Sequence, residues 1–143
     1  MHSANDFTFS DISEGTTYSG QYKIEHDIYD VFTSVFHDRS PVHVDNAYAK
    51  ASGFDGCVMH GAILNGFLSH FIGMSFPGRR ALLLSVNMNY HRPSYLDDEI
   101  ELTAVVRQKV ESTRVIVLNV KFVNSATQIL VASGKIQVAV RND

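Results

Sequence analysis

The sequence predicts an α+β fold in which a curved antiparallel sheet wraps around one long buried helix. Residues 60–76 have apolar side chains at helical spacing and hardly any polar ones, which is typical of a helix buried on most sides. The segments that follow alternate apolar and polar residues with period two, which is typical of strands with one buried face. The 143 residues, 45% of them hydrophobic, suffice for one domain over residues 1–143, with residues 1–15 as a loose lead-in.

The N-terminal part is expected to hold one strand and two helices. Residues 17–25 alternate as a strand does, and residues 26–38 place apolar side chains at helical spacing. Pro41 is expected to end that helix, because proline biases the residue before it away from the helical region. Asp45 is a good N-cap for a short helix over residues 46–52.

The central helix presents two different faces. One is broadly apolar, and only Asn65 and His70 are strongly polar within the segment. The dipeptide Pro77-Gly78 ends it. The other face is a stripe of small residues, Ala62, Gly66, Ser69 and Gly73.

Four strands are predicted after this helix, over residues 81–91, 99–111, 114–124 and 128–140. The connections between them are short enough for hairpins. The economical packing is the hot-dog arrangement, a curved antiparallel sheet wrapped around the buried helix. A plain α+β sandwich is the alternative.

Composition excludes several classes of function. The net charge of −3 and the scattered Lys and Arg residues disfavour nucleic-acid binding. Cys57 is the one cysteine, so no internal disulfide forms and a reducing compartment is compatible. The first residues lack the pattern of a signal peptide, and the apolar stretch 62–76 is too short for a membrane span. We therefore expect a soluble cytoplasmic protein without nucleic-acid or membrane partners.

Asp38 and His43 flank a proline turn and could perform acid–base chemistry. The negative end of the helix dipole disfavours a carboxylate at Asp38, which favours its use as a base. His43 follows five residues later, and an extended turn can bring its imidazole close to Asp38. Such a pair can hold and deprotonate a water molecule. The alternative is a hydrogen-bonded turn in which Asp38 caps loose amides and His43 fills a gap.

His60 and Gly61 begin the buried helix. Free backbone N–H groups at a helix N-terminus favour a developing oxyanion, and glycine lets a ligand approach the backbone closely. The pattern suggests a site for a thioester or similar carbonyl, whereas the alternative is a helix start whose amides meet water or side chains. His37, Asp38, His43 and Asp45 match a metal triad only loosely, so neither a metal nor a cofactor is expected.

Three stretches resemble the MaoC-like, (R)-specific enoyl-CoA hydratase family, which has the hot-dog fold. They are FHDRSPVHVDNAYA, FDGCVMHGAILNGFLS and NMNYHRPSYLDDEIEL. The resemblance implies that Asp38 and His43 are the catalytic pair and that the N–H of Gly61, next to His60, binds the thioester carbonyl. Ser69 falls where several hydratases carry a site serine. His37 and Asp97 stand where the family often has glycine.

The resemblance also implies a hydro-lyase that hydrates trans-2-enoyl thioesters reversibly to (3R)-3-hydroxyacyl thioesters. The expected partners are acyl-CoA or an acyl-carrier-protein thioester, and a second copy in a homodimer or higher homo-oligomer. The small stripe either lets a sheet or subunit approach the helix or leaves a groove for an acyl chain. Two other functions stay open, a hot-dog acyl thioesterase and a non-catalytic acyl-thioester-binding protein.

Overall fold

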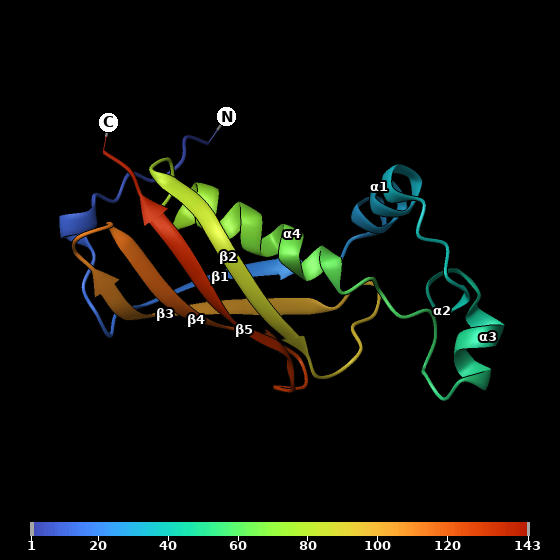
Figure 1. Cartoon of the computed structure of the whole chain (residues 1–143). Helices are drawn as coiled ribbons and strands as arrows, with labels where there is room; N and C mark the ends of the chain where they lie inside the picture. The colour runs from blue at the N-terminus through green and yellow to red at the C-terminus, as the bar shows by residue number, and fades with distance from the viewer. Residues whose placement is uncertain (1, 143) are drawn as a thin grey trace.

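The computed structural model describes residues 2–142, and its centre is a five-stranded antiparallel sheet curved around helix α4 (Figure 1). The strand order across the sheet is β1-β3-β4-β5-β2. This architecture confirms the predicted α+β class and the sheet wrapped around a helix. The strands are β1 (Thr17–Lys23), β2 (Ala81–Tyr90), β3 (Glu99–Val110), β4 (Val115–Asn124) and β5 (Leu130–Val140).

The inner face of the sheet and the apolar face of α4 (Ala62–His70) form the core. Alternate residues of β3, β4 and β5 are buried, as the period-two pattern predicts. Ile63, Leu64, Phe67 and Leu68 of α4 are buried against them. Each large apolar side chain contributes about 1.5–3 kcal/mol when it leaves water, so this face fixes where α4 lies.

The central helix differs from its predicted extent at both ends. The α-helix ends at His70 and continues as a π-helical turn, η2 (Phe71–Ser75), in which the Phe76 N–H donates to the Phe71 carbonyl at 2.9 Å. His60 and Gly61 precede the first regular turn. None of the helices within residues 2–142 is long and apolar enough to cross a membrane.

Strand β2 departs from the expectation of one buried face. Leu82 and Leu84 are 52% and 51% exposed, whereas Val86 and Met88 pack partly against the core. The physical reason is position, because β2 lies at the edge of the sheet and pairs only with β5. The register also shifts between Leu83 and Ser85, which changes the residues that face inward.

Three helices gather beyond the N-terminal end of α4 (Figure 1). They are α1 (His26–Phe36), α2 (Pro41–Val44) and α3 (Asn46–Ala51). Asp45 caps α3 as predicted, because its Oδ1 accepts a hydrogen bond from the Tyr48 N–H at 3.0 Å. Helix α2 replaces the expected extended turn, since Pro41 occupies its first position, where the fixed φ of proline suits a helix.

The N-terminal segment, expected as a loose lead-in, is held against the body of the protein. Ile12 is 1% exposed and belongs to the core. The Arg80 guanidinium donates hydrogen bonds to the Asp6 carboxylate, which holds the pKa of Asp6 below its ordinary value. These contacts tie residues before β1 to the start of β2.

Candidate active site

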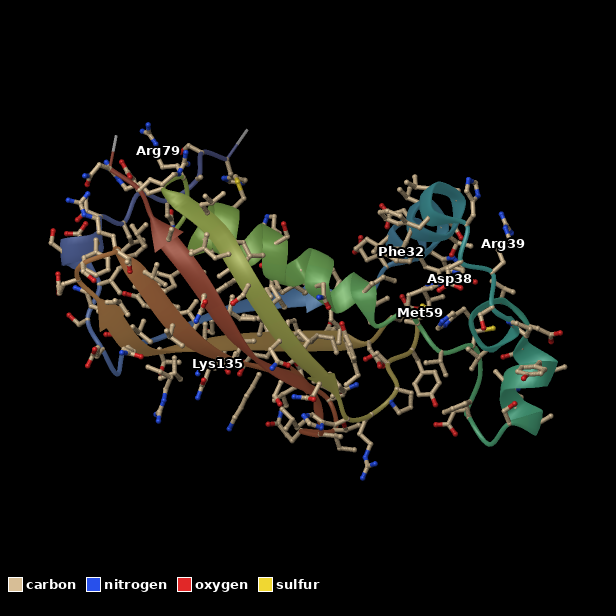
Figure 2. The ribbon with its side chains drawn as sticks, viewed as in Figure 1. Phe32, Asp38, Arg39, Met59, Arg79 and Lys135 are labelled. Carbon is tan, nitrogen blue, oxygen red and sulfur yellow. The ribbon has the colours of Figure 1, made fainter. Side chains whose placement is uncertain are left out.

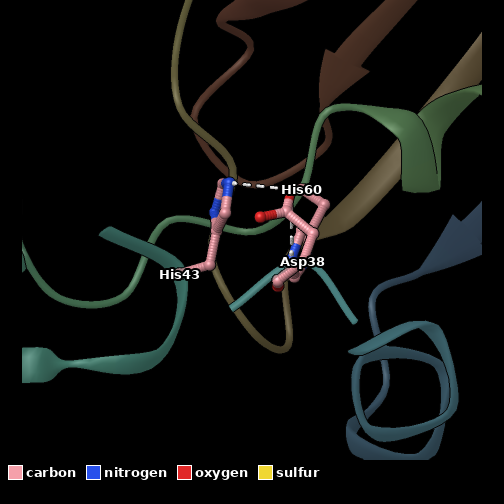
Figure 3. Close-up of side chains that lie close together, drawn as sticks. All are labelled: Asp38, His43 and His60. Carbon is pink, nitrogen blue, oxygen red and sulfur yellow. Dashed lines mark hydrogen bonds and ion pairs between the residues drawn. The ribbon is translucent and has the colours of Figure 1, made fainter. Parts of the chain in front are cut away.

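Asp38, His43 and His60 converge beyond the N-terminal end of α4 (Figure 3). Asp38 follows α1, His43 lies on α2, and His60 lies just before α4. Each can offer one atom such that the three atoms lie within 4.8 Å of one another. Figure 2 shows Asp38 near Phe32 and Met59, at the opposite end of the molecule from Arg79.

The two carboxylate oxygens of Asp38 face different surroundings. Oδ1 accepts the Ser40 N–H at 3.2 Å, and this bond closes a local turn. Oδ2 lies 3.9 Å from Nε2 of His43 and 3.9 Å from Nε2 of His60. Because the side chain is 52% exposed, the second oxygen can still accept a proton or a water molecule.

A left-handed residue directs Asp38 away from α1. His37 has φ 58° and forms the C-cap of the helix, with its N–H donating to the Thr33 carbonyl at 3.0 Å. Asp97 has φ 68°, also left-handed. Glycine adopts this region at little cost, so the backbone at both positions favours glycine, which the resemblance led us to expect there.

The ring of His43 is held in one tautomer. Its Nδ1 lies 2.6 Å from the Val58 carbonyl oxygen, which can only accept, so Nδ1 carries the proton. In the neutral ring Nε2 is therefore an acceptor, and it faces the Asp38 Oδ2 atom, another acceptor, at 3.9 Å. That distance is too long for a hydrogen bond. It suits one water molecule that donates to both atoms from about 2.8 Å.

The side chain of His60 lies behind this pair. It is 3% exposed, and its Nε2 donates to the Asp38 main-chain oxygen at 2.8 Å. Its ring stacks on the ring of His43, with centroids 4.0 Å apart, and lies 4.7 Å from the ring of Phe32. The buried ring therefore contacts the neighbouring site residues, and it is the main chain of His60 that lies at the start of α4.

Gly61 precedes the first regular turn of α4. Among residues 2–142, no acceptor is found for its N–H, and the positive end of the helix dipole adds to the field there. A Cβ at this position would lie 3.0 Å from Cε1 of Tyr90, so glycine also admits the Tyr90 ring. The Tyr90 hydroxyl donates to Oδ1 of Asn65. Tyr90 was not predicted as a site residue, because its place in β2 looked like a core position.

Two cavities meet at the cluster. The first, about 870 Å³, is apolar and lies between α1 and α4, with Phe32 and Gly66 in its walls and Asp38 among its lining residues. The second, about 620 Å³, is lined by His43, Gly61 and Tyr90 among others. Ala62 lines both. These volumes are typical of small-molecule sites, and an extended ligand could occupy both while it passes Asp38 and His43.

Ser69 is the predicted site residue that the structure does not bring to the cluster. It is exposed on α4 and lies eight residues after Gly61, roughly 12 Å farther along the helix. It shares a helix face with Gly66, which lines the apolar cavity.

Asp38, His43 and His60 could also be considered as metal ligands. The geometry argues for a different use, because the His60 Nε2 nearest the carboxylate already donates to a carbonyl. A metal at that nitrogen would have to break this bond. Of the four residues that the sequence offered for a metal, Asp38 and His43 are in the cluster, whereas His37 and Asp45 are not.

Comparisons with known proteins identify the family of the chain. The family model described as "MaoC like domain" matches residues 10–127. The chain is 32% identical over 99 residues to an (R)-specific enoyl-CoA hydratase of Rhodospirillum rubrum, covering 68% of each protein. It is 24% identical over 106 residues to a mitochondrial 3-hydroxyacyl-[acyl-carrier-protein] dehydratase of Arabidopsis thaliana, covering 73% of this chain and 63% of that protein.

Solved structures show the same fold. The unliganded R-hydratase PhaJ1 from Pseudomonas aeruginosa superimposes with a TM-score of 0.88 at 22% identity, covering 98% of this chain and 89% of the other. The (R)-hydratase from Aeromonas caviae gives 0.83 at 20% identity, covering 91% and 98%. The predicted hot-dog arrangement is thereby confirmed.

Proposed function

The chain belongs to the family of MaoC-like domains, and we propose that it is a hydro-lyase that interconverts trans-2-enoyl thioesters and (3R)-3-hydroxyacyl thioesters. The observation that carries the proposal is the 3.9 Å separation between two acceptors, Asp38 Oδ2 and His43 Nε2, beside the amide-lined start of α4. Hydratases and dehydratases among the relatives support this reaction class.

In the hydration direction, one water molecule sits between Asp38 and His43. Its oxygen forms a bond to C3 of the substrate while Asp38 takes one of its protons. The electrons of the C2–C3 double bond move toward the thioester carbonyl, whose oxygen becomes enolate-like. A proton then returns to C2 from the same pair, so the enzyme ends as it began and the product has gained one water.

The N–H of Gly61 would stabilise the enolate-like oxygen. The carbonyl of the same peptide group belongs to His60. One such donor is typically worth about 3–4 kcal/mol, and acid–base assistance about 10²–10⁴ in rate. Neither effect alone makes an efficient enzyme. The proposal therefore requires both to act on one thioester, and it is supported because His43 and Gly61 line the same cavity.

The acyl chain would occupy the apolar cavity between α1 and α4. This cavity reaches Asp38, and its wall includes Gly66 of the small stripe. Ser69, on the same helix face, would contact the substrate farther along. The thioester carrier, CoA or an acyl carrier protein, would approach through the second cavity, which is lined by Arg92 among others.

A homodimer completes the proposal. Strand β2 is a sheet edge with exposed Leu82, Leu83 and Leu84, and an uncovered apolar edge invites pairing with another strand. A second copy that pairs through β2 would cover these side chains. A cytoplasmic location is also part of the proposal, supported by the free Cys57, which a reducing compartment would preserve.

The test is to incubate the protein with crotonyl-CoA and, separately, with butyryl-CoA. The proposal predicts loss of the enoyl absorbance without release of free thiol, and formation of (3R)-3-hydroxybutyryl-CoA by chiral analysis. Thiol release from either compound would instead indicate a thioesterase. No reaction with either would indicate a binding protein, and both of these outcomes contradict the proposal.

A further inference from the structure

We propose that His60 is a positioning residue for the proposed reaction, and that it acts through its Nε2–H donor and the face of its ring. It holds the main chain of Asp38 and the imidazole of His43 in the relative positions that the bridging water needs. This inference rests on the proposed function, and its experiments are chosen so that the two can fail separately.

The hydrogen bond to Asp38 fixes a segment without regular structure. The last hydrogen bond of α1 ends at His37, and Asp38 then follows a left-handed residue. From His60, 22 residues away in sequence, Nε2 reaches the Asp38 carbonyl oxygen at 2.8 Å. Because that oxygen can only accept, Nε2 must carry a proton. This bond therefore fixes the main-chain position from which the Asp38 side chain extends.

The ring of His60 also supports His43. The two rings stack with centroids 4.0 Å apart and an interplanar angle of 29°. The Val58 carbonyl holds one edge of the His43 ring at Nδ1, and His60 covers one of its faces. The face contact restricts rotation of the ring about the edge bond, so that Nε2 stays directed toward Asp38.

The buried nitrogen of His60 distinguishes this role from simple packing. Within residues 2–142, the Nδ1 atom of His60 is buried and has no hydrogen-bond partner. A buried polar atom without a partner is unfavourable, so an apolar ring would fill the same space at lower cost. The gain that offsets this cost is the Nε2–H bond to Asp38, which no apolar side chain can make.

The first experiment compares His60→Gln with His60→Phe. Glutamine can place an N–H at about the reach of Nε2, whereas phenylalanine keeps a ring but has no donor. We expect His60→Gln to retain kcat within about tenfold and His60→Phe to lose at least about 10²-fold, because small misplacements of catalytic groups have effects of this size. KM and the affinity for butyryl-CoA should change little in both, since the ring is buried.

His60→Asn provides a matched control, because its shorter side chain cannot reach the Asp38 carbonyl. It should fold and should fall with His60→Phe in kcat. Full activity in His60→Phe or in His60→Asn would overturn the inference. A loss of butyryl-CoA binding that matches the loss of turnover would also overturn it, because it would mean direct contact with the substrate.

A measurement independent of turnover separates this inference from the proposed function. Proton–nitrogen correlation spectra of the histidine rings should show His60 protonated on Nε2 and His43 protonated on Nδ1. The His43 signals should keep that tautomer in His60→Phe, which retains a ring against His43, and become mixed in His60→Asn, which has none. If His43 is unaffected in His60→Asn, the positioning role is wrong. If the spectra behave as expected but no enoyl thioester is hydrated, only the proposed function is wrong.

Discussion

The Nε2 atom of His43 and the Oδ2 atom of Asp38 lie 3.9 Å apart without a hydrogen bond between them. The Val58 carbonyl makes Nε2 the acceptor of the neutral ring, and an ionised carboxylate can only accept. Two acceptors that face one another are unfavourable unless a donor lies between them. In the proposed reaction, the donor between them would be the water that adds to the double bond or, in the reverse direction, the substrate hydroxyl that leaves as water.

Asp38→Asn should lower the rate of crotonyl-CoA hydration by at least about 10²-fold, because the amide cannot take the proton of the water. The fold should survive, since the side chain is half exposed and asparagine can still accept the Ser40 N–H. Rates and thermal unfolding would be measured together. Asp45→Asn, at the N-cap of α3, is the matched control and should keep its activity. Unchanged turnover in Asp38→Asn would remove Asp38 from its role.

Gly66→Leu should shorten the acyl chain that the enzyme accepts. Nothing lies within 4 Å of a Cβ built at Gly66, and the residue lines the apolar cavity, so a leucine side chain would extend into it. We expect activity on crotonyl-CoA to persist and activity on 2-octenoyl-CoA to fall about tenfold or more, which corresponds to about 1.4 kcal/mol.

Gly73→Leu is the control for that variant, because a Cβ there is equally uncrowded and Gly73 does not line the cavity. Its chain-length preference should match that of the unmodified protein. If both variants keep the original preference, the acyl chain does not bind between α1 and α4.

The fold could be predicted from the sequence because its core has strong periodicity. Leu102, Val120 and Ile136 alternate with polar neighbours and are all buried on the inner face of the sheet. The proximity of Asp38 and His43 could also be predicted from the sequence, because both residues lie in one short segment. A local pattern is enough in these cases.

Contacts between residues far apart in the sequence could not be predicted in this way. The hydrogen bond from His60 to Asp38 joins residues 22 positions apart, and its direction depends on how α1 packs near α4. The exposure of Leu82 and Leu84 depends on the order of strands, because the same alternation would be buried in a central strand. Periodicity identifies an apolar face but not the neighbour that covers it.

His37→Gly should stabilise the protein slightly without reducing turnover. The left-handed conformation costs a non-glycine residue about 1–2 kcal/mol, whereas glycine adds an entropic cost of about 0.5–1 kcal/mol, so the net gain is at most about 1.5 kcal/mol. Urea unfolding would measure it. Arg39→Gly has no left-handed φ to relieve and should destabilise instead. A loss of activity in His37→Gly with the fold intact would show that the His37 side chain takes part in the reaction.

Tyr22→Phe should weaken the dependence of stability on alkaline pH. Burial raises the pKa of Tyr22 to about 12 in the folded protein, above the ordinary value of about 10 in an unfolded chain. Because the pKa is higher in the folded protein, the protonated Tyr22 hydroxyl favours the folded state. This contribution to stability is fully present below about pH 10 and is lost as the pH rises through about 12.

Unfolding midpoints across this range should therefore fall less steeply in Tyr22→Phe than in the unmodified protein. The variant also loses the hydrogen bond between the Tyr22 hydroxyl and Nδ1 of His70, so its stability at neutral pH should be somewhat lower. Tyr48→Phe, on exposed α3, serves as the control. Identical alkaline profiles for Tyr22→Phe and the unmodified protein would contradict a raised pKa of Tyr22 in the folded protein.

Leu84→Lys should convert the proposed dimer into a monomer. The side chain is exposed on edge strand β2, so the charge leaves the fold intact but would be buried without a partner if two β2 strands met. Sedimentation analysis would report the mass. Ile129→Lys, outside β2 and similarly exposed, should leave the assembly unchanged. A dimer that persists in Leu84→Lys would place the interface on another surface.

The most direct test of the account is a crystal structure of the Asp38→Asn variant with 2-octenoyl-CoA bound. The account predicts the thioester oxygen within hydrogen-bond distance of the Gly61 N–H, C3 facing the gap between residue 38 and His43, and the acyl chain between α1 and α4. A thioester bound away from Gly61, or a C3 atom that a water in that gap could not reach, would contradict it.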